Sequence, residues 1–162
     1  MKTLTANIAA IVLAVALDSL AKTLAENCLE FASPAPLLGN FFRLTLGYNT
    51  GVAFGLFANG GVLPLVLTGL IIVALAAWFV HAIRSGELPP IAGWVTGMIL
   101  GGAVGNFIDR LLDGRVTDFL DFGLGAARWP TFNLADSFIV VGAVLLLWVG
   151  LVSKHPGEDQ PS

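Results

Sequence analysis

The fold and the chemistry of this chain depend on residues 101–136, GGAVGNFIDRLLDGRVTDFLDFGLGAARWPTFNLAD. This stretch places polar residues between two apolar segments. It holds five of the eleven acidic residues: Asp109, Asp113, Asp118, Asp121 and Asp136. Acidic side chains inside or beside membrane spans are costly, so they are rare there unless they are paired or functional. The stretch therefore predicts a functional polar site, with Asp118 and Asp136 as its main candidates.

The composition around this stretch is that of a membrane protein. The chain has 162 residues, of which 56% are hydrophobic and only 12% charged, whereas a soluble domain has about 25% charged residues. The length predicts one domain over residues 1–162. The net charge is −3 and no basic cluster occurs, which argues against a nucleic-acid partner.

Four segments are long and apolar enough to cross a bilayer, which takes about 20 helical residues. They cover residues 4–24, 62–83, 91–112 and 132–152, and the second is expected to face lipid over much of its surface. The first resembles a secretion signal, but Asp18 follows its apolar run closely and three spans come later, so we expect a retained helix. The polar tail, 153–162, is expected to be disordered.

Two longer connections, 25–61 and 113–131, join the spans. In the first, Phe42, Leu44, Leu46 and Tyr48 alternate with other residues, and a period of two predicts a short strand. Prolines, glycines and asparagines surround it, which favours a small cap outside the membrane. The predicted fold is an all-α membrane protein with four transmembrane helices and a small extramembrane β-containing cap.

Glycines recur at every fourth position of the third span, at residues 93, 97, 101 and 105. This spacing predicts a face of small residues against which another helix packs closely.

The four spans place both long connections on one side of the membrane. Asp18 and Lys22 approach that side at the end of the first span. The third span ends there and the fourth begins there, carrying the remaining polar residues Asn106, Asp109, Arg110, Asn133 and Asp136. The polar residues are therefore expected to converge on one membrane face. The distribution of Lys and Arg does not decide which face this is.

Several of these residues also have simpler structural interpretations. Asp18 and Lys22 have the spacing of a helical ion pair, which is favoured over a Ser19–Lys22 nucleophile pair. Asp136, in a first helical turn, could act only as a cap.

For the other acids the simpler interpretations are of two kinds. Asp109 and Arg110 suggest a fixed ion pair or a hydrogen-bonded strut. Asp118 and Asp121 could lie in a solvated loop. Each interpretation would usually hold for a single residue, but together they leave the convergence on one face unexplained.

The remaining reactive residue types give little support to other chemistries. Cys28 is the only cysteine, and it is interpreted as a small apolar residue. His81 and His155 are the only histidines and no HExxH motif occurs, so neither a metal site nor a cofactor is predicted.

The motifs, in order, resemble those of the lipoprotein signal peptidase (signal peptidase II) family. They are Asp18-Ser19-Leu20-Ala21-Lys22, Asn49-Thr50-Gly51-Val52-Ala53-Phe54, Gly101-Gly102-Ala103-Val104-Gly105-Asn106-Phe107-Ile108-Asp109-Arg110, Val116-Thr117-Asp118-Phe119 and Phe132-Asn133-Leu134-Ala135-Asp136. Each motif alone is weak, but the ordered set with four spans covers nearly the whole chain.

The resemblance implies an aspartic endopeptidase of the bacterial inner membrane, with cytoplasmic termini and a site near the outer face. Such enzymes remove the signal peptide of prolipoproteins before a diacylglyceryl-modified cysteine, act among membrane lipids, and are inhibited by globomycin. The resemblance assigns catalysis to Asp118 and Asp136. It assigns supporting or substrate-binding positions to Asp18, Lys22, Asn49, Gly51, Asn106, Asp109, Arg110 and Asn133.

Two positions depart from the expected pattern. Thr117 replaces an apolar residue before the first catalytic aspartate, and Tyr48 replaces a basic residue before the Asn-Thr-Gly motif.

Two neighbouring carboxyl groups cannot both ionise cheaply, so they would share a proton and activate water. The alternatives are a small transporter or channel, whose acids would be spread across the membrane, and a presenilin-like protease, whose GxGD motif is missing. A purely structural membrane protein would leave the paired asparagines and aspartates unexplained.

Overall fold

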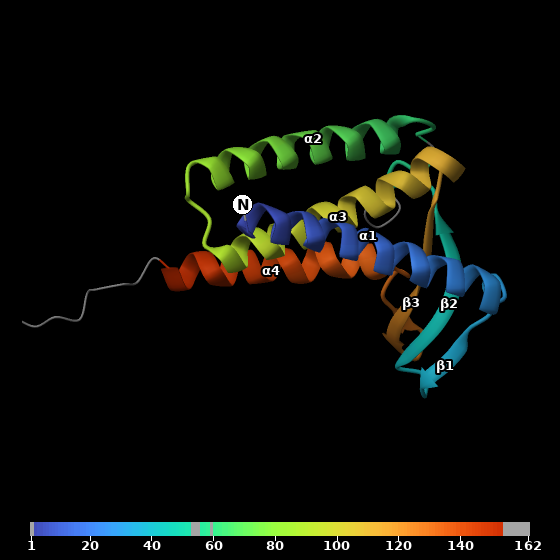
Figure 1. Cartoon of the computed structure of the whole chain (residues 1–162). Coiled ribbons are helices and arrows are strands. Elements are labelled where there is room, and N and C mark those ends of the chain that lie inside the picture. The colour runs from blue at the N-terminus through green and yellow to red at the C-terminus, as the bar shows by residue number, and fades with distance from the viewer. Residues whose placement is uncertain (1, 53–55, 59, 154–162) are drawn as a thin grey trace, which may run out of the picture.

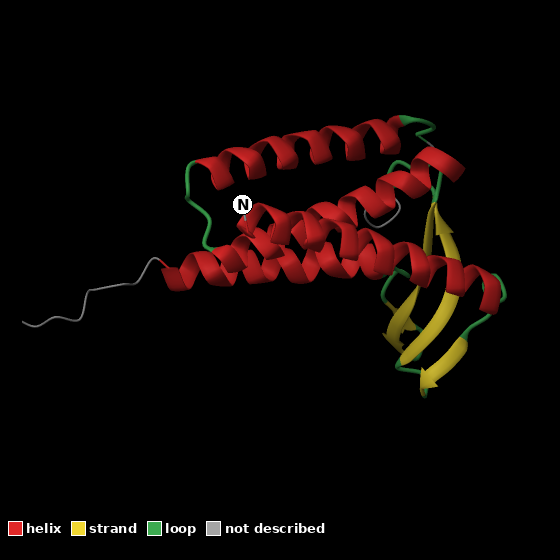
Figure 2. Ribbon diagram, viewed as in Figure 1, coloured by secondary structure: helices red, strands yellow, loops and turns green. Residues whose placement is uncertain are grey.

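The computed structural model of the protein describes residues 2–52, 56–58 and 60–153. In this part of the chain, long helices lie side by side and a small sheet is attached at one end (Figures 1 and 2). The helices are α1 (Lys2–Cys28), α2 (Leu63–Arg84), α3 (Pro90–Asp113) and α4 (Leu134–Ser153). The strands are β1 (Ala35–Leu38), β2 (Phe42–Asn49), β3 (Val116–Leu124) and β4 (Ala127–Arg128).

The helices confirm the predicted membrane architecture. By length and composition, all four are able to cross a membrane. Pro90 occupies the first turn of α3, where a missing N–H costs nothing. Gly114 ends α3 in the left-handed conformation (φ +69°) and donates its N–H to the carbonyl of Arg110. The expected disordered tail lies outside the described residues, apart from Ser153.

α3 is the central helix, and its glycine face confirms the predicted close packing. It contacts α1, α2 and α4. A Cβ atom on Gly97 would lie 3.0 Å from the Cβ of Ala10, and one on Gly101 would lie 2.6 Å from the Cβ of Ala14. Only glycine allows the backbones of α1 and α3 to approach this closely.

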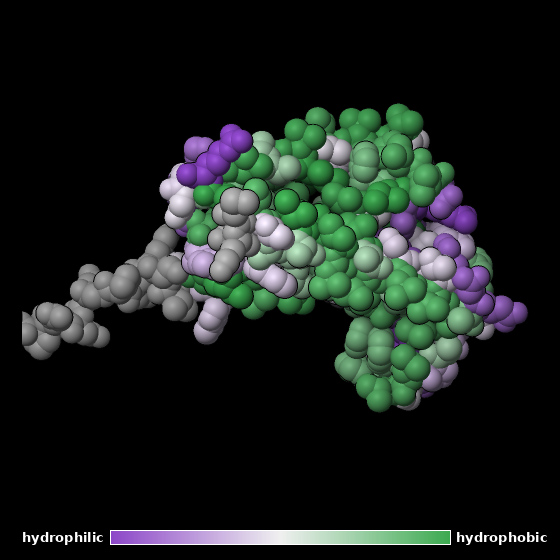
Figure 3. Space-filling view, viewed as in Figure 1, coloured by the Kyte–Doolittle hydropathy of each residue, from purple (hydrophilic) through white to green (hydrophobic). Residues whose placement is uncertain are grey.

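α2 contacts α3 and exposes much of its remaining surface, as expected of a lipid-facing helix. Leu70, Ile71 and Val73 are all more than half exposed. Apolar side chains cover most of the helical surface in Figure 3, and the hydrophilic residues gather toward the two ends. This distribution fits a bundle whose sides face lipid.

The sheet confirms the β-containing cap but corrects its extent. Its strands pair antiparallel in the order β1-β2-β3-β4, and β2 pairs with β3 from Phe42 opposite Phe122 to Asn49 opposite Val116. The second connection, 113–131, is therefore largely strand, and the interpretation of Asp118 and Asp121 as residues of a solvated loop is wrong. The sequence of β3 does not show the apolar–polar alternation of a strand, because buried aspartates, Asp118 and Asp121, occur on both of its faces.

The cap is held against α1 by a small apolar core. Leu46 of β2, Phe119 of β3 and Ala25 of α1 are buried together. The pairing of β2 with β3 is irregular between Leu44 and Gly47, and beyond it Gly47 lies opposite Asp118. The core and the pairing together place Asp118 beside the ends of the helices.

Candidate active site

Lys22 is the cationic centre of the polar cluster. Its Nζ lies 2.6 Å from Asp18 Oδ2, which confirms the predicted helical ion pair. It also lies 2.8 Å from Asp109 Oδ2 and donates to Asn106 Oδ1 at 3.0 Å. The ammonium group therefore has three acceptors, from α1 and α3. Ser19 is exposed whereas Lys22 is buried, which argues against the Ser19–Lys22 nucleophile pair.

Asp18 also joins α1 to the start of α4. Its Oδ1 accepts a hydrogen bond of 2.8 Å from the backbone N–H of Ala135, one of the donors that a helix N-terminus leaves unpaired. A Cβ atom on Gly105 would lie 2.7 Å from Asp18 Oδ2. The last glycine of the α3 face thus leaves room for this carboxylate.

Asn133 and Asp136 cap the N-terminus of α4 reciprocally. The N–H of Asp136 donates to Asn133 Oδ1 at 2.9 Å, and the N–H of Asn133 donates to Asp136 Oδ2 at 3.4 Å. This arrangement is a capping box, so the capping interpretation of Asp136 is correct. However, Asp136 Oδ1 also accepts a bond of 2.8 Å from Asn106 Nδ2, which lies outside the cap.

Asn133 connects this cap to Asp118. Its Nδ2 donates to Asp118 Oδ1 at 2.7 Å and to Asn106 Oδ1 at 3.1 Å. The backbone carbonyl of Thr117 accepts a third, longer contact of 3.3 Å. One asparagine side chain therefore contacts the residues that carry both candidate carboxyl groups.

Asp118 is buried, with 3% of its surface exposed, whereas Asp136 is partly exposed. Burial is the main cause that raises the pKa of Asp118 to about 7, and the negative charge of Asp136 adds to it. The hydrogen bond from Asn133 and the charges of Lys22 and Arg110 oppose the rise in pKa. A carboxyl group in this environment holds a proton near neutral pH.

Asp121 is also buried but lies away from this cluster. Arg43 donates to its Oδ2 at 2.6 Å and Thr45 at 2.7 Å, while Arg128 donates to its Oδ1 at 2.8 Å. Burial favours a higher pKa, but the bonds from Thr45, Arg128 and Arg43 outweigh it and hold the pKa of Asp121 below its usual value. The expectation that Asp121 is solvated is wrong. Its cationic partners cannot be predicted from the sequence, because they depend on the pairing of distant strands.

Asp109 and Arg110 do not form the predicted ion pair with each other. Asp109 pairs with Lys22 instead, and its Oδ2 also accepts a long bond of 3.3 Å from the N–H of Thr117. Arg110 donates to the carbonyls of Gly51, at 2.6 Å, and Asn106, at 3.1 Å. The alternative prediction of a hydrogen-bonded strut is the correct one for Arg110.

The Asn-Thr-Gly segment is attached to the site through this strut. Asn49 Oδ1 accepts a bond of 2.9 Å from the N–H of Gly51, which shapes the turn that presents the Gly51 carbonyl to Arg110. Ala53 and Phe54 of the same motif lie outside the described residues.

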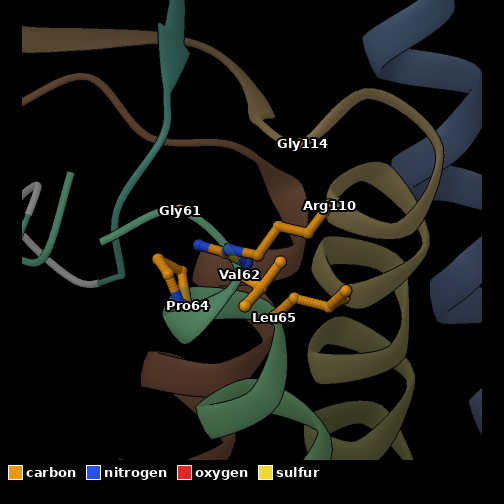
Figure 4. Close-up of a pocket in the computed structure, with 6 residues that line it drawn as sticks. All are labelled: Gly61, Val62, Pro64, Leu65, Arg110 and Gly114. Carbon is orange, nitrogen blue, oxygen red and sulfur yellow. The ribbon is translucent and has the colours of Figure 1, made fainter. Parts of the chain in front are cut away.

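A small cavity of about 80 Å³ lies on the α2 side of Arg110. Arg110 extends from α3 toward Val62 and Pro64, with Gly61, Leu65 and Gly114 completing the lining (Figure 4). None of the lining residues is an aspartate. The polar cluster, and not this cavity, therefore defines the candidate site.

The cluster combines two carboxyl groups with fixed amide and ammonium donors. Such an arrangement is able to move a proton between carboxyl groups and to activate water. Within the described part of the chain, no three histidine, cysteine or acidic residues are grouped so as to hold a metal ion.

Comparison with known proteins gives a consistent family relationship. Residues 10–152 match the family model described as signal peptidase (SPase) II. The chain is 38% identical over 145 residues to the lipoprotein signal peptidase of Neisseria meningitidis serogroup C (strain 053442), covering 90% of this chain and 88% of the relative. It is 41% identical over 150 residues to the lipoprotein signal peptidase of Azoarcus sp. (strain BH72), covering 90% of this chain and 82% of the relative.

Solved structures support the same fold. A bacterial membrane enzyme solved by the in meso method at 2.3 Å resolution superimposes with a TM-score of 0.81 and 24% identity, covering 96% of this chain and 93% of that one. Another bacterial membrane enzyme, solved by the same method at 1.9 Å resolution, superimposes with a TM-score of 0.74 and 26% identity, covering 95% of this chain and 94% of that one. With the family model matched across all four helices and the cap, this chain belongs to the signal peptidase II family and is a bacterial membrane peptidase of the lipoprotein signal peptidase type.

Proposed function

We propose that the protein is an aspartic endopeptidase in which Asp118 and Asp136 form the catalytic pair. The observation that supports this most strongly is the position of Asn133, which donates to Asp118 Oδ1 and caps α4 together with Asp136. The supporting positions are Asp18, Lys22, Asn49, Gly51, Asn106, Asp109, Arg110 and Asn133. They hold the two aspartates through the hydrogen bonds and ion pairs described above.

The pair shares one proton in the resting enzyme. The raised pKa of Asp118, about 7, keeps that carboxyl protonated in a large fraction of the molecules at neutral pH. Asp136 receives N–H donors from Asn106 and Asn133, which suit a carboxylate. The proton belongs to the pair as a whole, and its titration is a property of both residues.

Hydrolysis then follows from these protonation states. Asp136 takes a proton from a water molecule, whose oxygen attacks the carbonyl carbon of the scissile amide. Asp118 donates a hydrogen bond to the oxygen on which negative charge develops. The C–N bond breaks as Asp118 transfers its proton to the leaving nitrogen, and the pair keeps one proton because Asp136 holds the one taken from water. The products are a new carboxyl group on the signal peptide and a free amine on the cysteine.

The substrate is a prolipoprotein that is cut before a diacylglyceryl-modified cysteine. Each methylene buried in the bilayer contributes roughly 0.8 kcal/mol, so two acyl chains hold the cysteine at a fixed depth in the membrane. The polar cluster lies where the helices meet the cap, which is the depth of the membrane surface in this arrangement. Anchoring therefore orients the scissile bond beside the two aspartates.

The membrane in question is the bacterial inner membrane, with both termini in the cytoplasm and the active site near the outer face. The family relationship supports this orientation. The even number of candidate spans among the described residues supports only that both termini lie on the same side. Globomycin-type peptides would inhibit the enzyme by lying between the two carboxyl groups.

The test is cleavage of one prolipoprotein in two forms by the purified enzyme. The form with a diacylglyceryl-cysteine should be cut before that cysteine, and the form with a bare thiol should be cut at least 100-fold more slowly, since anchoring replaces a weak encounter. Globomycin should block the reaction, while zinc chelators and serine-directed reagents should not. Equal cleavage of both forms, or inhibition by a chelator, would contradict the proposal.

A further inference from the structure

Thr117 precedes Asp118 on β3, and each of its polar groups is engaged. Its N–H donates to Asp109 Oδ2 and its carbonyl accepts from Asn133 Nδ2, both at 3.3 Å. Its hydroxyl donates to Glu26 Oε1 at the much shorter distance of 2.7 Å. Long bonds are weak and a short bond to a carboxylate is strong. The Glu26 contact is thus the strongest local restraint on Thr117.

Glu26 belongs to the last turn of α1, at the surface of the protein. Its contact joins residues that are 91 positions apart in the chain. The neighbouring Ala25 packs on Phe119 in the apolar core of the cap. The end of α1 therefore holds β3 on both sides of Asp118, through an apolar contact at Phe119 and a polar one at Thr117.

The geometry of a strand converts this restraint into the orientation of Asp118. Successive side chains of a strand point to opposite faces. When Thr117 is fixed toward Glu26 on α1, Asp118 is directed to the opposite face, where Asn133 donates to its carboxyl group. A rotation of β3 about its own axis would break both contacts.

We infer that Glu26 and Thr117 form a positioning pair that sets the orientation of Asp118 for catalysis, an inference that rests on the proposed function. Neither residue takes part in bond making or breaking. An apolar residue at position 117, which the family resemblance leads one to expect, cannot form this bond. The bond therefore depends on the threonine that this chain has at position 117.

The test is a double-mutant cycle with kinetic readouts on the lipidated prolipoprotein. Thr117→Val removes the hydroxyl with little change in shape. Glu26→Ala should not affect folding, because Glu26 is exposed. Each should lower kcat by about 3- to 10-fold and leave KM within about twofold, as loss of one hydrogen bond in the transition state predicts. The double variant should be no slower than the slower single variant, because both changes remove the same bond.

Conservative variants and a surface control separate positioning from a general structural effect. Thr117→Ser and Glu26→Gln keep a donor and an acceptor, so their kcat should stay within about twofold of the wild type. Glu30→Ala removes another exposed acid four residues further along the chain and should leave kcat unchanged. The inference would be overturned if kcat were unaltered in Thr117→Val and Glu26→Ala. It would also be overturned if the losses multiplied in the double variant, or if only KM changed.

Asp118→Asn, measured in the same assay, distinguishes the two proposals. If Asp118→Asn still turns over the substrate, the proposed catalytic pair is wrong, and the positioning pair falls with it. If Asp118→Asn is inactive but Thr117 and Glu26 show no coupling, only the positioning pair is wrong.

Discussion

Asp118 and Asp121 lie three residues apart on β3, so the alternation of the strand directs their side chains to opposite faces. Asp118 is buried beside Asn133 and feels the negative charge of Asp136, and the pKa of its carboxyl rises to about 7. Asp121 meets two arginines and a threonine, and the pKa of its carboxyl falls. The surroundings, and not the residue type, decide which aspartate is able to hold a proton.

The raised pKa of Asp118 predicts a characteristic dependence on pH. Cleavage should fall as pH rises through about 7, because the pair then loses its shared proton. In addition, the folded state binds more protons than the unfolded state between about pH 4 and 7, so the free energy of unfolding should decrease across that range. This decrease should amount to about 2 kcal/mol or more at pH 8, and the Asp118→Asn variant should not show it. A pH–rate profile and thermal unfolding in detergent measure the two effects. Cleavage that increases steadily up to pH 9 would contradict the assignment of the proton.

Asp121→Asn is expected to destabilise the cap. The substitution leaves Arg43 and Arg128, which are only 21% and 18% exposed, facing each other without a carboxylate. Breaking a buried charge pair costs about 3–5 kcal/mol, and partial exposure lowers this to about 2–3 kcal/mol. Asp113→Asn is the control, because Asp113 is exposed and should change stability by less than about 0.5 kcal/mol. Equal unfolding temperatures for the two variants would argue against this role of Asp121.

The sequence predicts residue contacts within a helix better than contacts between distant strands. Asp18 and Lys22 could be paired from their spacing, because four residues along a helix bring side chains together. The partners of Asp121 could not, because its contact with Arg43 depends on the register of β2 and β3, and 78 residues separate the two. Local periodicity carries no information on such a register.

At the scale of elements, α3 provides two things at once. Its glycines bring α1 close, and its last turns supply Asn106, Asp109 and Arg110 to the site. Helix existence could be predicted from length and apolar content, and the glycine spacing identified the packed face. The strand β3 cannot be predicted from the sequence, because aspartates on both of its faces do not give the apolar–polar alternation of a half-buried strand.

Gly101→Ala is expected to push α1 away from α3. The added Cβ would lie 2.6 Å from the Cβ of Ala14 and 2.7 Å from the carbonyl oxygen of Ile11, and backbone atoms cannot yield easily. We expect a loss of about 1–3 kcal/mol in stability, with reduced cleavage because Asp18 and Lys22 move with α1. Gly150→Ala is the matched control, since its added Cβ would meet no atom within 4 Å apart from its chain neighbours and the backbone of its own helix, and it should gain up to about 1 kcal/mol. If both variants unfold at the same temperature, the close approach is not needed.

At the scale of the whole molecule, the helices expose apolar side chains along their sides and gather the candidate site at the end that carries the cap (Figures 1 and 3). This arrangement follows from the count of four spans, which the sequence predicts. The inside or outside location of that end does not follow from the count, because the charged residues are too few and too evenly distributed.

Reporter fusions should settle the orientation. A fusion at Ser85, in the turn between α2 and α3, and one after the last residue should both report the cytoplasm. A fusion at Ala126, in the turn between β3 and β4, should report the outer side. The fusions at Ser85 and at the C-terminus serve as controls for each other, since four spans require both positions to lie on the same side of the membrane. The reverse pattern would place the candidate site on the wrong side for secreted lipoproteins.

The central claim is that Asp118 and Asp136 together activate water. Its most direct test is the turnover number of Asp118→Asn and of Asp136→Asn on a lipidated prolipoprotein, with Asp113→Asn as the control. Both single variants should fold, insert in the membrane and bind substrate, and each should lose at least about 1,000-fold in kcat, because an amide cannot share or transfer the proton. Asp113→Asn should retain the wild-type rate. Turnover within tenfold of the wild type by either Asp118→Asn or Asp136→Asn would contradict the claim.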